Sequence, residues 1–267
     1  MKVTTRMTNA ALMLIAMAGI LLSLPQVSGA AVTGNGAAVQ PQQENAVSSA
    51  AEARLSKKQF HDVKVTVDNG IATLSGTVAL FEYKLDAEKQ VRHAKGVMAV
   101  RNLIEVTGPN IADQDLQAKL VEKLEYDRVG YGNVFNAISV AVDHGVATVG
   151  GHARTDVDKD SALALVATTP GVKDLIENIE VDPVSLMDDQ TRFAVARAVY
   201  GYATLNKYAI DPGKPIRISV QNGNVELYGV VDSQSDKDTA NIRANGVSGV
   251  FSVKNYLQVA NQPTEHQ

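Results

Sequence analysis

The chain has 267 residues, of which 45% are hydrophobic, and a formal net charge of -4 at pH 7. It contains neither Cys nor Trp, and the lack of Cys excludes disulfides and thiolate metal sites. The negative charge disfavours a general nucleic-acid-binding protein, because such proteins present a basic face.

Residues 1–30 have the order of a secretory signal peptide. Lys2 and Arg6 precede an apolar run at 10–24, and small residues follow up to Ala30. An uncleaved anchor helix is the alternative, but the run is shorter than the roughly 20 residues that span a bilayer. We therefore predict export of the protein, with cleavage after Ala30.

After a Gly-, Ala- and Gln-rich linker at 31–44, one pattern occurs three times. It reads VTVDNGIATLSGTV at 65–78, VAVDHGVATVGGHA at 140–153 and ISVQNGNVELYGVV at 218–231. Two alternating runs around a Gly-containing turn predict a β-hairpin. The second strand of each hairpin contains a glycine, Gly76, Gly151 or Gly229. Such a glycine marks a β-bulge or a close backbone approach, and we expect the next helix to pass over it.

Helical spacing follows each hairpin, and a third strand follows each helix. The helices are predicted at 80–95, 155–168 and 233–244, and the strands at 97–106, 172–181 and 250–259. Asp156 and Ser233 are candidate N-caps. Another helix precedes the second and third hairpins, at 112–124 and 188–200. Its counterpart at 45–57 has fewer apolar residues, so we expect it to be shorter or frayed.

These elements predict an α+β fold of three tandem α-β-β-α-β units at 45–107, 112–182 and 187–260, with a tail at 261–267. Each unit is expected to pack a small three-stranded mixed sheet against two helices. The element order, the glycine spacing and the endings VRNLIEV at 100–106 and VKNYLQV at 253–259 resemble the BON domain. The second unit departs from this ending, because Glu177 replaces the asparagine.

The resemblance implies the function as well as the fold. An exported protein with tandem BON domains resembles osmotically inducible proteins of the periplasm. That family is expected to bind phospholipid at membrane surfaces and to support the cell envelope under stress. It brings no established catalytic residues, so the resemblance implies a periplasmic protein that is not an enzyme.

No catalytic motif of the common hydrolase, P-loop or zinc-protease types occurs in the chain. His144 and His152 could approach one another only loosely across a hairpin. The carboxylates Asp156, Asp158 and Asp160 resemble the start of a calcium loop, but its Gly and closing Glu are missing. We therefore predict no cofactor and no metal site.

The charge differs between the units. The first (45–108) has nine Lys and Arg against seven Asp and Glu, the second (112–182) six against thirteen, and the third (188–260) eight against seven. The helix at 80–95 carries the candidate lipid-binding residues Lys84, Lys89, Arg92 and Lys95. They favour an anionic phospholipid surface. The alternative is an ordinary solvated helix face.

Aromatic residues gather in the loops that precede the second and third hairpins. They are Tyr126, Tyr131 and Phe135 in the second unit and Tyr200 and Tyr202 in the third. They could form a partner-binding or membrane-interface edge, or fold back as core. The second functional hypothesis is therefore an adaptor or scaffold that binds other envelope proteins.

Overall fold

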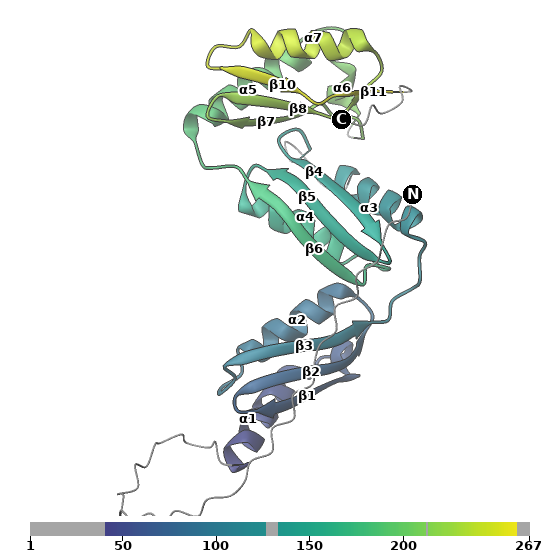
Figure 1. The fold of residues 1–267 in the computed structure, drawn as a ribbon, viewed down its shortest axis with the longest axis vertical. Helices are drawn as coiled ribbons and strands as arrows, with labels where there is room; N and C mark the ends of the chain where they lie inside the picture. Colours follow the sequence, from purple (N-terminus) through teal and green to yellow (C-terminus); the bar gives the residue numbers. More distant parts are fainter. Residues whose placement is uncertain (1–40, 127–132, 212, 261–267) are drawn as a thin grey trace, which may run out of the picture. The chain divides into compact units, whose positions relative to one another are not determined.

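The computed structural model describes residues 41–126, 133–211 and 213–260 (Figure 1). The segments predicted as signal peptide, linker and tail lie outside this part of the chain, apart from the last residues of the linker. The first unit contains α1 (Pro41–Arg54), the short 3-10 helix η1 (Lys58–Phe60), β1 (Val63–Asp68), β2 (Ile71–Val78), α2 (Phe81–Arg92) and β3 (Ala99–Val106).

The second unit contains α3 (Asp113–Tyr126), β4 (Ala137–Asp143), β5 (Val146–Ala153), α4 (Asp156–Ala167) and β6 (Asp174–Val181). The third contains α5 (Leu186–Tyr200), α6 (Lys207–Ile210), β7 (Arg217–Gln221), β8 (Asn224–Tyr228), β9 (Val230–Val231), α7 (Gln234–Asn245), β10 (Ser252–Asn255) and β11 (Gln258–Val259). The predicted α+β fold of three repeated units is confirmed.

Each unit has a mixed three-stranded sheet with the second hairpin strand in the centre. The orders are β1-β2-β3, β4-β5-β6 and β7-β8-β10. The hairpin strands pair antiparallel, and the last strand pairs parallel to the central one. In the first unit α1 packs on β1, α2 packs on β3, and the two helices contact each other. A parallel pair needs a crossover connection, which α2, α4 and α7 supply in the three units.

The cores follow the predicted alternation. Ala72, Leu74 and Val78 are buried in β2, and Ala87 and Val91 are buried in α2. The corresponding residues of the other two units are buried as well, so each sheet has one apolar face covered by helices.

Three local predictions are wrong. Helix α1 is as long as α3, with 14 residues each, so the apolar-poor first helix is not shortened. The side chain of Thr155, not that of Asp156, caps α4, whereas Ser233 caps α7 as predicted. The last strand of the third unit is divided into β10 and β11, although hydrogen bonds from Tyr256 and Gln258 to the central strand continue across the gap.

The strand glycines are structural, but the helix is not what approaches them. A Cβ atom would lie 2.0 Å from the Asp62 oxygen at Gly76, 2.0 Å from the Ala137 oxygen at Gly151 and 2.6 Å from the Pro215 oxygen at Gly229. These carbonyls stand at the same place in each unit, at or just before the first strand. All three glycines have positive φ, between 104° and 130°. The predicted passage of the helix over them is therefore corrected to a close approach of the neighbouring strand.

An acidic residue at the start of each first helix holds the hairpin turn. Glu44 accepts a hydrogen bond from the backbone N–H of Asn69, at 3.1 Å. Asp113 accepts from His144 and Gly145, at 2.7 and 2.9 Å. In the third unit Asp188 accepts from Asn222 and Gly223, both at 2.9 Å. The turns with positive φ at Asn69, His144 and Asn222 are thus tied to the helices.

Candidate functional site

The predicted basic helix face is not continuous. Lys84 is half-buried, with its ammonium 5.9 Å from the centre of the Phe81 ring. Glu88 lies one turn further along the helix and forms an ion pair with Arg92. The Glu88 carboxylate also accepts a hydrogen bond from Asn102. Lys84 is therefore less accessible than the other three predicted residues, and Glu88 separates it from them along the helix.

The remaining cations lie towards the C-terminal end of α2. Lys89, Arg92 and Lys95 are exposed there. Met98, in the loop that follows, is 77% exposed. Its side chain lies against Gly70 of the hairpin turn, because a Cβ at Gly70 would meet the Met98 Cε at 2.5 Å. This end of the first unit thus combines cations with an exposed apolar side chain.

The residue at the Met98 position differs in each of the three units. Lys173 takes this place in the second unit, and Phe251 takes it in the third. Phe251 is 81% exposed and lies against Gly223 in the same way as Met98 lies against Gly70. Apolar residues therefore stand at this position in the two units whose charge is positive.

The third unit has further exposed apolar residues at the same end. Val184 is 99% exposed, and Leu186 and Met187 at the start of α5 are largely exposed. Asp188, the next residue, binds the hairpin turn whose Gly223 touches Phe251. A cluster of this kind, at the end of a folded unit, is typical of a contact surface.

Two of the aromatic residues predicted to bind partners, Phe135 and Tyr200, are structural. Phe135 is 1% exposed and packs in the core of the third unit, edge to face with Phe193 at 5.1 Å. The guanidinium of Arg154 lies 5.8 Å from the centre of the Phe135 ring. Phe135 is therefore not accessible to a partner, which corrects its predicted role. Tyr131 lies outside the described residues.

The tyrosines of the third unit divide between core and surface. Tyr200 donates its hydroxyl to the Ile216 carbonyl at 2.6 Å, and burial raises the pKa of this phenol well above its usual value. Tyr208 is buried, and its hydroxyl bonds Asp236 at 2.8 Å. Tyr202 is exposed with Arg243 over its ring, and Tyr126 of the second unit is also exposed. Among the described members of the predicted aromatic set, Tyr126 and Tyr202 are the exposed ones.

A buried polar network joins the linker after the second unit to the third unit. Asp182 accepts hydrogen bonds from Arg192 at 2.9 Å and from Gln221 at 2.8 Å. Arg192 also binds Asp189, at 2.5 Å, and the Val220 carbonyl, at 2.9 Å. Asp182 was expected only to end the second unit, yet it anchors the first helix and first strand of the third.

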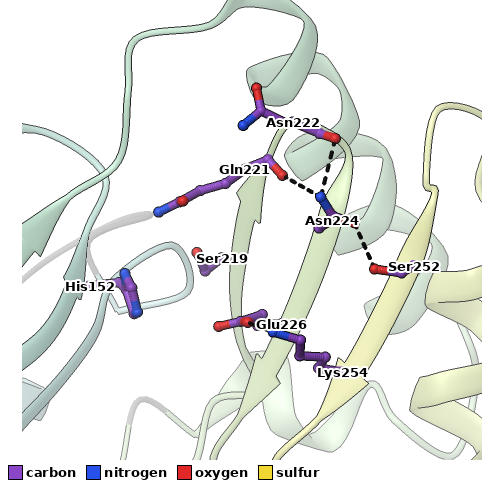
Figure 2. Close-up of a pocket in the computed structure, with 8 residues that line it drawn as sticks. All are labelled: His152, Ser219, Gln221, Asn222, Asn224, Glu226, Ser252 and Lys254. Atoms are coloured by element: carbon purple, nitrogen blue, oxygen red, sulfur yellow. Dashed lines mark hydrogen bonds and ion pairs between the residues drawn. The ribbon is translucent and has the colours of Figure 1, made fainter.

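Beside this network lies a polar groove of about 440 Å³ on the open face of the third sheet (Figure 2). The strands β7, β8 and β10 supply most of its lining, and His152 of β5 stands on the other side. The lining residues are His152, Ser219, Gln221, Asn222, Asn224, Glu226, Ser252 and Lys254. Sequence analysis considers His152 only as a metal-ligand candidate and does not identify the other lining residues as a site.

The described residues do not assemble a metal cluster: nowhere among them do three His, Asp or Glu side chains come together as ligands. In the same part of the chain, no helix has the length and hydropathy needed to cross a membrane. His144 lies beside Asp143, and the Asp156 to Asp160 segment forms the start of α4.

Comparison with known proteins decides the family. The BON domain model matches residues 42–108, 112–183 and 202–261. The chain belongs to the BON domain family. It is similar to osmotically-inducible protein Y of Escherichia coli (strain K12), with 26% identity over 197 residues, which cover 69% of this chain and 91% of that protein.

Solved structures also match the BON protein. CdsD, a structural protein of the type III secretion system of Chlamydia trachomatis, is 19% identical; the match covers 79% of this chain and 90% of that one, with a TM-score of 0.23. The PrgH periplasmic domain is 11% identical, covering 75% and 96%, with a TM-score of 0.21.

The structure explains the BON ending read in the sequence. The side chain of Asn102 donates to the Lys84 carbonyl of α2 and accepts from the N–H of Ile104. In the third BON unit Asn255 makes the same two bonds, to Lys237 and Leu257. In the second unit Glu177 instead forms an ion pair with Lys159. The asparagine therefore joins the last strand to the helix.

Proposed function

We propose that this BON protein is an exported, non-enzymatic protein that binds anionic phospholipid surfaces in the periplasm and supports the envelope under osmotic stress. The similarity to an osmotically-inducible protein supports the stress role. The order of residues 1–30 supports the export.

The observation that carries the membrane proposal is the end of the first unit. Lys89 and Lys95 are exposed near the end of α2 that leads to Met98, which is itself exposed; Arg92 is exposed as well but pairs with Glu88. Each cation near an anionic membrane contributes about 1 kcal/mol, and an apolar side chain adds the energy of leaving water. The second unit has an excess of acidic residues and Lys173 at the Met98 position, so it would be repelled.

The adaptor hypothesis has less support. Phe135 and Tyr200 belong to the core, which leaves Tyr126 and Tyr202 as the accessible members of the predicted set among the described residues. The acidic second unit is the feature that favours a partner, because a basic protein surface would be attracted to it.

Co-sedimentation with phosphatidylglycerol vesicles tests the membrane proposal. The test variant is Lys89→Glu/Lys95→Glu, and the matched control is Lys119→Glu/Lys173→Glu, which makes the same charge change on exposed lysines of the second unit. We expect the wild type to bind at low salt and the test variant to bind at least about tenfold more weakly. The control should keep most of its binding.

Two results would contradict the proposal. One is the absence of vesicle binding by the wild type at low salt. The other is an equal loss in both variants, since this would mean that net charge alone, and not the end of the first unit, determines the binding.

A further inference from the structure

The open face of the third sheet differs in composition from that of the other two. Glu226 and Tyr228 on β8 stand where the first unit has Thr73 and Ser75, and the second has Thr148 and Gly150. On the last strand, Lys254 and Tyr256 replace Arg101 and Leu103 of the first unit and Ile176 and Asn178 of the second. On the central strand, large polar residues thus replace the small ones of the other two units, and on the last strand the third unit places a lysine and a tyrosine beside them.

The charged groups on this face are paired with each other. Lys254 lies 3.1 Å from the Glu226 carboxylate, which also accepts a hydrogen bond from the Tyr228 hydroxyl. Burial alone would raise the pKa of Glu226, but the bonds from Tyr228 and Lys254 outweigh it and hold the pKa below its usual value. Next to the groove, Asp182 is neutralised by Arg192. The groove therefore offers many hydrogen-bonding groups and little net charge.

Two stacked tyrosine rings lie outside the lining of the groove, two residues after Glu226 and Lys254 along the chain. The rings of Tyr228 and Tyr256 are 5.1 Å apart with an interplanar angle of 19°. Tyr256 is half-exposed, so part of its ring remains available. Amide groups stand at the other end: Gln221 is held by Asp182, and the Asn224 amide donates to the Gln221 carbonyl at 3.3 Å (Figure 2).

We propose that this groove binds a neutral oligosaccharide. A sugar ring has hydroxyls on its edge, which match the amides and the Lys254–Glu226 pair, and an apolar C–H face, which matches a tyrosine ring. The volume of about 440 Å³ is within the range of small-ligand sites, roughly 300–1,000 Å³. The paired charges disfavour an anion or a cation, because neither would find an uncompensated partner. This site is separate from the membrane surface proposed for the first unit.

Titration of the whole exported chain with an uncharged tetramer of β-1,4-linked N-acetylglucosamine, followed by calorimetry and amide NMR, tests this assignment. Maltotetraose is the second probe, and inorganic phosphate is the charged comparison. We expect saturable binding of at least one tetrasaccharide, with a Kd below about 1 mM, and shifts of the backbone signals of β8 and β10.

The test variant is Tyr256→Ala, and its matched control is Leu103→Ala, at the same position of the first unit and also exposed. Tyr256→Ala should weaken tetrasaccharide binding at least about tenfold, while Leu103→Ala should leave it unchanged. Both variants should retain wild-type binding to phosphatidylglycerol vesicles, so failure of this proposal is distinguishable from failure of the membrane proposal.

Three outcomes would overturn the assignment: no saturable binding of either tetrasaccharide, phosphate binding in the groove in place of sugar, or an equal effect of the two variants. Thermal unfolding of each variant shows whether the fold persists. If Tyr256→Ala does not fold, Asn224→Ala takes its place with the same expected loss.

Discussion

The Nη2 atom of Arg192 lies 2.9 Å from Oδ2 of Asp182, and only 3% and 1% of the two side chains are exposed. Asp182 belongs to the linker after β6, and Arg192 belongs to α5. The pair therefore fixes how the third unit begins, and its hydrogen bonds reach the strand β7 through Gln221 and the Val220 carbonyl.

Removing one member of this buried pair should be costly. Arg192→Met leaves Asp182 charged and buried, so we expect a loss of about 3–5 kcal/mol in the free energy of unfolding. Arg92→Met, which breaks the more exposed pair with Glu88, should cost below about 1 kcal/mol. Urea unfolding measures both. Equal losses would show that the Asp182–Arg192 pair has no special role in the third unit.

Adjacent glycines in β5 allow a direct test of the close approach. Gly151→Ala forces a Cβ to 2.0 Å from the Ala137 oxygen at a φ of 104°, so we expect a loss of more than about 2 kcal/mol. Gly150→Ala meets its nearest atom, the Asn178 oxygen, at 3.5 Å and should cost below about 1 kcal/mol. Thermal unfolding compares them, and similar melting temperatures would refute the explanation.

The clamp between Asp113 and the hairpin turn predicts a pH dependence. The backbone N–H groups of His144 and Gly145 hold the pKa of Asp113 below its usual value of 3.8. Because the folded-state pKa is depressed, the stabilisation is complete above 3.8 and is lost as the pH falls below that value through the folded pKa. The stability advantage of the wild type over Asp113→Asn should therefore be constant near neutral pH and shrink in acid.

Unfolding titrations between about pH 2.5 and 7 measure this difference. Asp115→Asn, which removes an exposed carboxylate from the same helix turn, is the control and should show a smaller pH-dependent difference. A difference between wild type and Asp113→Asn that does not change with pH would contradict the clamp.

The absence of Trp makes the chain suitable for single-tryptophan reporters of membrane contact. Met98→Trp should show a blue-shifted emission on addition of phosphatidylglycerol vesicles, because the side chain leaves water. Lys173→Trp, at the same position of the second unit, should show none. A shift at both positions, or at neither, would count against contact through the end of the first unit.

Much of the fold follows from local pattern in the sequence. The period-2 runs around Asn69, His144 and Asn222 locate the hairpins, since each of these residues adopts positive φ in the turn. The capping by Ser233 follows from its side chain in the same way. These features depend on neighbouring residues in the chain, which is why a single sequence can reveal them.

Contacts between distant residues were not predictable in the same way. The acidic residues Glu44, Asp113 and Asp188 suit a helix start, and nothing in the pattern indicates that they bind a hairpin turn 25 or more residues away. The low apolar content of α1 predicts a short helix, whereas Ala51 in α1 and Leu55 just after it pack in the core of the first unit.

For the candidate sites too, local features can be read from the sequence and contacts between distant residues cannot. The sequence identifies the first unit as the basic one with glutamates among its helix cations, and the structure adds that Glu88 pairs with Arg92. The groove of the third unit combines residues from β5, β7, β8 and β10, and no spacing along the chain connects them.

The packing of Phe135 against the following unit affects the order in which the parts of the protein fold. Phe60, its counterpart in the first unit, packs in its own unit, whereas Phe135 packs with residues of the third. Phe81 of the first unit likewise packs with the second. Because the chain is synthesised from its N-terminus, each of these rings stays in water until the next unit has been made. Complete burial of Phe81 and Phe135 therefore depends on the folding of the unit that follows each of them.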